Sequence, residues 1–181
     1  MDQIIDIMDI IKKRRSIRVY KNNSLPKDTI DSILEAVRYT PTARDLQQLE
    51  YKVITNKNLI QKISDRIVEI AKDEIPSLQT REDPDKIFHS APFLILITGP
   101  RDNPWIDVEA GLAAQNIMLY ATSIDLGTCF IGLIKFIEKD KEMLKELNID
   151  EGKRIAAAVI CGYVDEKPPE KEKKMNVEFF Q

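Results

Sequence analysis

The sequence of 181 residues is poor in the residues that mark several large classes of protein. It holds 6 glycines and 9 prolines, too few for a collagen-like or low-complexity chain. Two cysteines cannot build a disulfide framework or a cysteine-rich zinc site, and one histidine argues against a metal centre made of imidazoles. We therefore expect no bound metal, and thiols kept reduced in a cytoplasmic protein.

Long apolar runs and a strong excess of one charge are also missing. The longest apolar runs, such as 93–97, fall well short of the ~20 residues of a membrane helix, and the N-terminus lacks the pattern of a signal peptide. Lys and Arg number 27 against 30 Asp and Glu, which gives a net charge of -3. Proteins that coat nucleic acid are usually basic, so we expect neither a nucleic-acid nor a membrane partner.

What the chain does contain suits a folded enzyme-sized domain, with 43% hydrophobic residues for a core and 31% charged residues for a surface. Apolar residues at helical spacing alternate with short apolar or β-branched runs typical of strands. The expected helices cover about 3–15, 26–39, 56–71, 105–124 and 138–147, and the expected strands cover 51–55, 93–98, 128–131 and 155–163. This pattern predicts an α+β fold with helices around a four- or five-stranded sheet.

The last part of the chain has a different composition. Residues 167–174 are charged and contain two prolines, and Met175, Val177 and Phe179 then alternate with polar residues as in a strand. A strand on such a linker can pair with its own sheet or with the sheet of a second subunit. We therefore divide the chain into a domain at 1–165 and a linker-and-strand extension of the same domain at 166–181.

Three arginines and a serine follow the first expected helix: Arg14, Arg15, Ser16 and Arg18. Guanidinium groups match the oxygens of phosphate, so this basic segment is a candidate anion site. The alternative is a solvated basic end of a helix. Neither glycine-rich phosphate loop, G-x-G-x-x-G or G-x-x-x-x-G-K-S/T, is present, so a cofactor phosphate would have to be held by side chains.

Four pieces of the sequence, in order, resemble the nitroreductase family of flavoproteins. The family opening R-R-S-x-R matches residues 14–18, and P-S-A-x-N-x-Q-P-W is matched in part by 41–47. The later motif G-x-A-x-Q-N-x-x-L-x-A, followed by G-L-G-T-C-W-I-G, resembles 111–121 and 126–132. A buried strand with Gly-Tyr and a basic, proline-rich stretch completes the resemblance, which spans nearly the whole chain.

The resemblance implies a mainly antiparallel sheet and a homodimer with FMN at the subunit interface, its C-terminal strand exchanged between subunits. It implies electron transfer from NADH or NADPH through FMN to a nitroaromatic, a quinone or a related small acceptor, by a ping-pong mechanism. The cofactor carries this chemistry, so no catalytic side-chain acid or base is expected. The family also contains dehalogenating, flavin-destroying and ring-forming members, which leaves the acceptor open.

By the same resemblance, individual positions receive roles. The residues expected to bind the FMN phosphate are Arg14, Arg15, Ser16, Arg18 and Lys173. Lys171 and Lys174 are alternatives to Lys173. The residues expected to border the flavin ring or the ribityl chain are Thr42, Ala43, Asp45 and Gln47. Those expected to lie along the ring near N5 are Phe130, Ile131 and Gly132. Three departures concern the ring contacts: Asp45 replaces Asn, Gln48-Leu49 replaces Pro-Trp, and Phe130 replaces Trp.

Two other functions compete with an oxidoreductase. A flavin-binding protein without turnover, such as a sensor or carrier, is kept open by Asp45 and by the missing Pro-Trp. A regulator that binds nucleic acid through residues 12–18 is disfavoured by the acidic composition and by the lack of aromatic residues among those basic positions.

Overall fold

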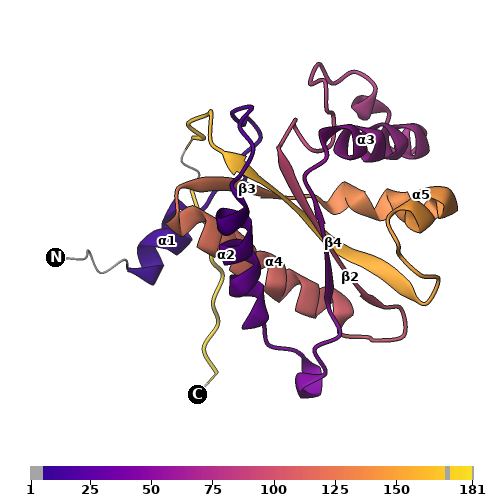
Figure 1. Cartoon of the computed structure of the whole chain (residues 1–181). Helices are drawn as coiled ribbons and strands as arrows, with labels where there is room; N and C mark the ends of the chain where they lie inside the picture. Colours follow the sequence, from indigo (N-terminus) through magenta and orange to yellow (C-terminus); the bar gives the residue numbers. More distant parts are fainter. Residues whose placement is uncertain (1–5, 170–171, 181) are drawn as a thin grey trace.

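A four-stranded antiparallel sheet forms the centre of the structure, a computed structural model that describes residues 6–169 and 172–180 (Figure 1). Its strands are β1 (Glu50–Ile54), β2 (Phe93–Pro100), β3 (Leu126–Phe130) and β4 (Lys153–Tyr163). They lie in the order β1-β2-β4-β3, and every neighbouring pair is antiparallel. The expected α+β architecture with a mainly antiparallel sheet is confirmed, with four strands.

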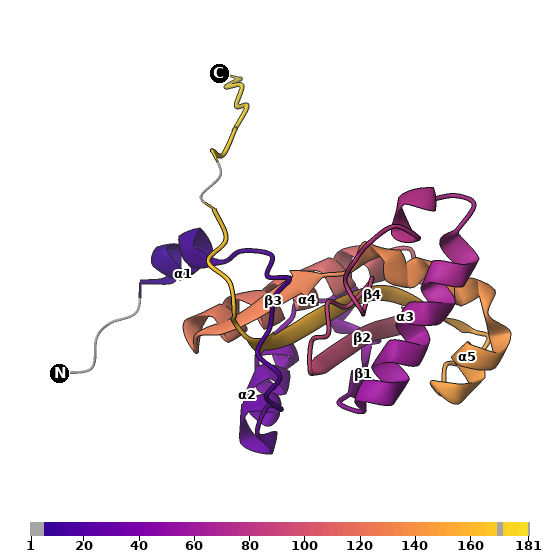
Figure 2. The ribbon, with the colours of Figure 1, turned by 90° about the horizontal axis from the view of Figure 1, so that it is seen from above.

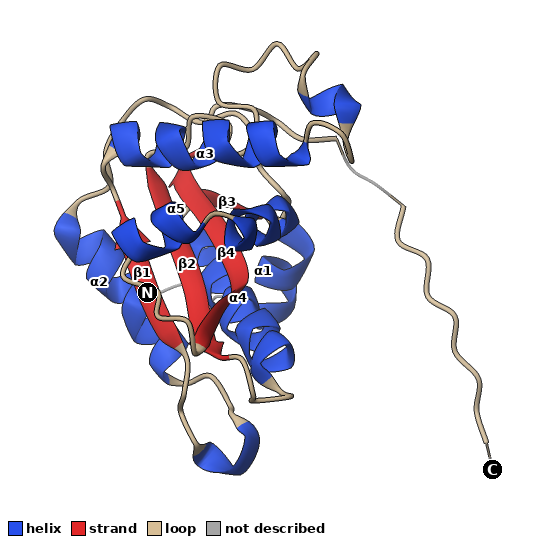
Figure 3. Cartoon of the chain, turned by 90° about the vertical axis from the view of Figure 1, so that its right-hand side faces the viewer, coloured by secondary structure: helices blue, strands red, loops and turns tan. Residues whose placement is uncertain are grey.

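Helices cover both faces of this sheet (Figure 3). One face carries α3 (Lys57–Ala71), the 3-10 helix η3 (Gly132–Lys139) and α5 (Lys141–Glu146), and the other carries α2 (Lys27–Arg38) and α4 (Ile106–Ser123). The first helix, α1 (Ile7–Lys13), contacts α4, and two short 3-10 turns complete the set: η1 (Ala43–Asp45) and η2 (Pro76–Leu78).

The alternation of side chains along β2 builds a separate core on each face. Phe93, Ile95 and Ile97 pack with α2 and α4, whereas Leu94 and Leu96 pack with α3 and η3. All five side chains are fully buried, so this strand is apolar on both sides, as a central strand covered by helices should be.

The central helix α4 packs closely on the sheet because small residues line its buried face. Ala110, Ala113 and Ala114 are fully buried, and β4 contributes Ala156 and Ala157 to the same core. The 18 residues of α4 give the helix a length of about 27 Å. It therefore extends beneath most of the sheet and connects distant parts of the molecule.

Gly127, at the start of β3, allows two other segments to approach that strand. A Cβ at this position would lie 2.8 Å from side-chain atoms of both Ile17 and Val164. The chain after α1 and the chain after β4 consequently both pack against β3. Tyr20 and Val164 are joined there by an antiparallel bridge.

Three expected elements differ from the structure. The helix expected at 138–147 is divided into the end of η3 and the shorter α5, and the start of the first helix, at residue 3, lies outside the described residues. Residues 172–180 have no secondary structure and run away from the body of the protein (Figure 2). Pairing of this segment with the chain's own sheet is therefore wrong, while exchange with a second subunit stays a prediction.

Within the described part of the chain, no helix has the length and apolar character needed to cross a membrane. The same residues contain no group of three or more His, Cys, Asp or Glu side chains placed to hold a metal ion. Both cysteines are buried free thiols, and they belong to the cores on opposite faces of the sheet.

Candidate functional site

The basic segment at 14–18 lies along the edge of β3. Arg14 caps the C-terminus of α1, and its backbone N–H donates to the carbonyl of Ile10. Two residues later, Ser16 forms a parallel bridge with Thr128, and the N–H of Ile17 donates to the Thr128 carbonyl at 2.9 Å. The end of a helix and the edge of a strand thus fix the backbone of the segment.

The arginines in this segment have different surroundings. The Arg15 guanidinium donates to the backbone carbonyls of Lys12 and Arg14, the second at 2.9 Å, so it helps to close the end of α1. The Arg14 and Arg18 side chains form no ion pair with any carboxylate among the described residues. Arg14 and Arg18 therefore carry positive charge that an anionic ligand could compensate.

The buried thiol of Cys129, on β3, is influenced by the neighbouring basic segment. Burial raises the pKa of this thiol, while the positive charges of Arg18 and Arg14 and a hydrogen bond with Ser16 oppose the increase. Ser16 is bridged to Thr128, the residue before Cys129, so Arg14 and Arg18 each lie within two residues of the point where the basic segment meets β3. Their combination of charge and hydrogen-bond donors suits a phosphate.

The residues after Cys129 continue the same surface. Phe130 ends β3 with 43% of its side chain exposed, and Ile131 is buried with its N–H donating to the Ala158 carbonyl at 2.9 Å. Gly132 begins η3 and faces open space. At about 3.3 Å per residue, Phe130 lies ~7 Å along the strand from Thr128, so the structure brings 130–132 and the basic segment together.

The loop at 42–47, between α2 and β1, is held by hydrogen bonds within itself. The Thr42 hydroxyl accepts the N–H of Gln47 at 3.1 Å, and the Gln47 amide donates to Asp45 Oδ1 at 2.8 Å. Arg44, Asp45 and Gln47 all have positive φ, of 54°, 54° and 51°. This left-handed backbone is uncommon for residues other than glycine, so the loop has a specific shape.

This loop and the basic segment lie at opposite ends of α4. The N–H of Ala43 donates to Glu109 near the start of α4, whereas Lys13 pairs with Asp125 just beyond its C-terminus, at 2.6 Å. Figure 1 shows the same separation, with α1 at the left and the loop below the sheet. One chain therefore does not bring Thr42, Ala43, Asp45 and Gln47 to the residues expected at the phosphate.

Lys173 is not brought to the basic segment either. It lies in the 172–180 segment, which extends from the body in Figures 2 and 3 and whose side chains are exposed. Of its two expected competitors, Lys174 lies in the same exposed segment, and Lys171 is outside the described residues.

Two carboxylates at the site were not expected from the sequence. Glu109 is a buried acidic residue that accepts the N–H of Ala43, and Glu166 accepts the N–H groups of Arg18 and Val19. The sequence could have pointed to Glu109, because it is an acidic residue on the face of the expected helix at 105–124 that is otherwise apolar. Glu166 gave no such signal, because it stands among many charged residues.

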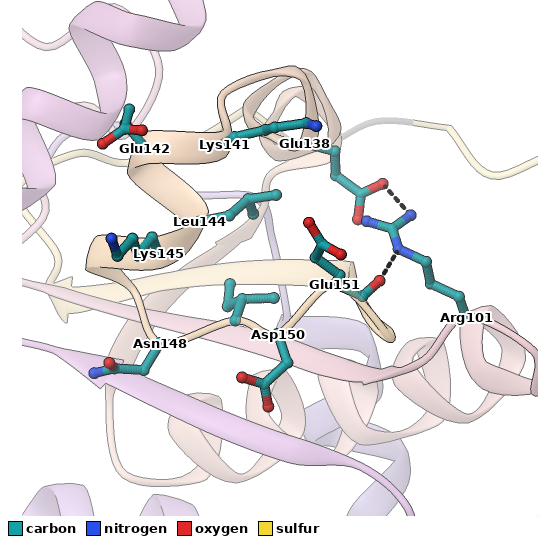
Figure 4. Close-up of a pocket in the computed structure, with 10 residues that line it drawn as sticks. Arg101, Glu138, Lys141, Glu142, Leu144, Lys145, Asn148, Asp150 and Glu151 are labelled. Atoms are coloured by element: carbon teal, nitrogen blue, oxygen red, sulfur yellow. Dashed lines mark hydrogen bonds and ion pairs between the residues drawn. The ribbon is translucent and has the colours of Figure 1, made fainter.

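A cavity of about 750 Å³ lies elsewhere, beside α5 (Figure 4). Arg101 and Glu138 line it and pair at 3.3 Å, and the same guanidinium donates to the Glu151 carbonyl at 3.0 Å. Glu138 also accepts the N–H of Ile155 at 2.7 Å. These contacts fasten the ends of β2 and β4 to η3, and none of the predicted site residues lines the cavity.

Comparison with known proteins gives a family and a fold. The model of the Nitroreductase family matches residues 11–163. A protein of Methanothermobacter thermautotrophicus named "Putative NADH dehydrogenase/NAD(P)H nitroreductase" is 26% identical over 169 residues, covering 91% of this chain and 80% of its own length.

Solved structures share the fold over nearly the full chain. A nitroreductase from Bacteroides fragilis with bound FMN superposes with a TM-score of 0.85 at 24% identity, covering 98% of each chain. An oxidized iodotyrosine deiodinase bound to FMN and 3-iodo-L-tyrosine has a TM-score of 0.78 at 19% identity, covering 97% of this chain and all of its own. Both of these structures contain bound FMN, and the second also contains 3-iodo-L-tyrosine.

Proposed function

Because the chain belongs to the Nitroreductase family, we propose that it is an FMN-dependent oxidoreductase that moves electrons from NADH or NADPH to a small organic acceptor. The observation that carries the proposal is the position of the basic segment at 14–18 on the edge of β3, where Ser16 is bridged to Thr128, two residues before Phe130. It supports a phosphate site beside the partly exposed Phe130, against which a flavin ring would lie.

When bound, FMN supplies two-electron redox chemistry, so that NAD(P)H and the acceptor react in turn in a ping-pong sequence. In this proposal Arg14, Ser16 and Arg18 bind the phosphate by charge-assisted hydrogen bonds. Arg15 keeps the end of α1 closed and thereby holds the segment in place. Phe130, Ile131 and Gly132 form the wall against the ring, and no side chain of the protein has to donate or remove a proton.

The second half of the flavin site comes, in this proposal, from a second copy of the chain. The loop at 42–47 is separated from the basic segment by the length of α4, which is about 27 Å. If both regions touch one FMN, they must belong to different subunits. Thr42, Ala43, Asp45 and Gln47 of one subunit would then border the flavin whose phosphate the other subunit binds.

Exposed apolar residues support this homodimer. Trp105, Val108 and Leu112 follow one another at helical spacing on α4 and are 57%, 58% and 42% exposed. In the extension at 166–181, Met175 and Phe179 are each 84% exposed. A second subunit would bury both sets, with the extension reaching across from the domain at 1–165 and bringing Lys173 toward a phosphate.

The acceptor in this proposal is a nitroaromatic, a quinone or a related compound, and the protein acts in the cytoplasm, where NAD(P)H is available. The test starts from purified protein, which should be yellow and contain FMN. Anaerobic NADH or NADPH should bleach the flavin absorbance, and nitroaromatic, quinone or halogenated acceptors should restore it. A protein that takes up no FMN contradicts the proposal, and bound flavin that neither nucleotide bleaches favours a carrier without turnover.

A further inference from the structure

Glu109 is a buried carboxylate on the first turns of α4. Only 2% of the residue is exposed, and its Oε1 accepts the backbone N–H of Ala43 at 2.9 Å. Its Oε2 is buried without a hydrogen-bond partner in the described part of the chain. Burial of a carboxylate is costly, so packing alone does not account for this residue at a position where alanine or another small residue would fit the helix face.

The environment of Glu109 compensates part of this cost. The N-terminus of α4 carries partial positive charge, which favours an acidic side chain within its first turns. The N–H of Ala43 adds a hydrogen bond to a charged acceptor, which is stronger than one between neutral groups. Of these two effects, the hydrogen bond from Ala43 connects the start of α4 with the loop at 42–47.

That loop needs an external support for its shape. Its three left-handed residues, Arg44, Asp45 and Gln47, are less favourable than ordinary backbone, and they persist only where the surroundings determine the conformation. Asn116 reaches Thr40 at 3.3 Å before the loop, and Asn103 reaches Gln48 at 3.2 Å after it. Glu109 holds the start of the loop through Ala43, directly before the three left-handed residues.

We infer that Glu109 is a positioning residue that fixes the loop at 42–47 in the conformation that contacts the flavin ring. This inference rests on the proposed function. Glu109 does not touch the phosphate donors, which lie at the other end of α4. Its loss should therefore weaken recognition of the ring, and it should leave recognition of the phosphate unchanged.

A comparison of FMN with riboflavin separates these two contributions, because riboflavin has the same ring and lacks the phosphate. Dissociation constants can be measured for both by quenching of flavin fluorescence on binding. Glu109→Ala should weaken FMN and riboflavin by the same factor, about tenfold. Arg18→Ala should weaken FMN alone. Glu109→Gln keeps an oxygen that accepts the Ala43 N–H, so it should recover most of the affinity lost in Glu109→Ala.

A second measurement needs no flavin. Arg44 lies exposed in the loop, and trypsin cleaves after arginine where the backbone is free to move. Glu109→Ala should be cut after Arg44 faster than the wild-type protein, and Glu109→Gln should behave like the wild type. This readout tests the support of the loop even if the protein binds no FMN.

Asp140→Ala is the matched control. Asp140 has a side chain only 8% exposed and also accepts a backbone N–H, from Met143 at 3.0 Å, but it is the N-cap of α5 on the opposite face of the sheet. At an equal loss of thermal stability, Asp140→Ala should affect neither riboflavin binding nor cleavage at Arg44. Equal effects of both variants, or riboflavin binding by Glu109→Ala as tight as in the wild type, would overturn the inference. A wild-type protein that binds neither flavin would instead contradict the proposed function.

Discussion

One carboxylate oxygen of Glu166 accepts the backbone N–H groups of two successive residues, Arg18 and Val19, the second at 3.1 Å. The first residues of the extension are thereby fastened to the end of the basic segment. A reciprocal bond runs from the N–H of Asp165 to the carbonyl of Val19 at 3.0 Å. Movement of the extension and the geometry of the candidate phosphate site are therefore coupled.

The first prediction concerns this contact. Glu166→Ala leaves two backbone N–H groups without their acceptor, which should cost about 1–2 kcal/mol at this half-exposed position. For a chain of this size, that loss corresponds to a midpoint of thermal unfolding lower by about 2–8 °C. Glu178→Ala, which removes an exposed carboxylate further along the extension, is the control and should leave the midpoint unchanged. Equal midpoints for both variants would show that the contact adds no stability.

The second prediction concerns the phosphate. Arg18→Ala removes one charge-assisted contact, which should weaken FMN binding by roughly 10- to 150-fold, equivalent to about 1.5–3 kcal/mol. Riboflavin should lose little affinity. Arg38→Ala removes an exposed arginine on α2 and should alter neither constant. If Arg18→Ala weakens both flavins equally, the assignment of Arg18 to the phosphate is wrong.

The third prediction concerns Asp45, which is exposed and accepts a hydrogen bond from Gln47. A carboxylate near the ring disfavours the reduced flavin, because reduction adds negative charge to the ring. For a separation of ~6 Å and an effective dielectric constant of ~20, it should lower the midpoint potential of FMN by about 60 mV. Asp45→Asn should therefore raise the midpoint potential of bound FMN at pH 7, as measured by spectroelectrochemistry. An unchanged potential would mean that Asp45 does not face the ring or that its charge is neutralised.

The fourth prediction concerns stability at low pH. The N–H of Met143 and the guanidinium of Arg66, 2.6 Å away, lower the pKa of Asp140 below its ordinary value of 3.8. Because the pKa is lower in the folded state than in the unfolded state, Asp140 stabilises the fold above pH ~4, and this contribution is lost as the pH falls through the folded-state pKa. Asp140→Asn should thus be less stable than the wild type at pH 7.

Denaturant unfolding at pH 7, 4 and 3 measures this effect. The difference between wild type and Asp140→Asn should be largest at pH 7 and should shrink below pH ~4, where the wild-type carboxyl takes up a proton. Asp31→Asn changes a more exposed carboxylate of an i,i+4 pair with Lys27 and should show a small difference throughout. A wild-type advantage over Asp140→Asn that grows toward pH 3 would contradict the assignment.

The fifth prediction concerns the extension. A chain that ends at Lys167 keeps Glu166 and its contacts but lacks the apolar residues at 175–180. If the extension embraces a second subunit, this truncated protein should dissociate at higher concentrations than the full chain and should be purified with less FMN. Analytical ultracentrifugation and flavin absorbance measure both properties. A truncated protein that stays dimeric and retains its full FMN content would show that the extension does not contribute to the interface.

The parts of the fold that follow from local pattern were predictable. Apolar periodicity gave α3 and α4 to within a residue or two, because each helix buries a long apolar surface in one of the cores. The 3-10 helix η3 was missed, although Ile131, Ile134 and Ile137 are buried at a spacing of three, the period of such a helix. Residues 175–179 form no strand within one chain, because a strand exists only beside a hydrogen-bonded neighbour.

The sequence predicted which residues form the candidate site, but it did not predict how they are arranged in space. Arg14, Ser16 and Arg18 stand together in the sequence, and the bridge from Ser16 to Thr128 fixes their segment beside β3. The distance between this group and the loop at 42–47 depends on the length and direction of α4, which no local motif contains. The partnership of Glu109 with Ala43 joins positions 66 residues apart and likewise depends on tertiary structure.

The placement of two half-sites at the two ends of α4 has a genetic consequence. In a symmetric dimer, each flavin would use the phosphate half of one chain and the loop half of the other. A mixed dimer of an Arg18→Ala chain and a Glu109→Ala chain would then contain one site with both defects and one site with neither. At FMN concentrations too low to fill either single variant, the two alleles would complement each other, up to half of the wild-type activity per mixed dimer.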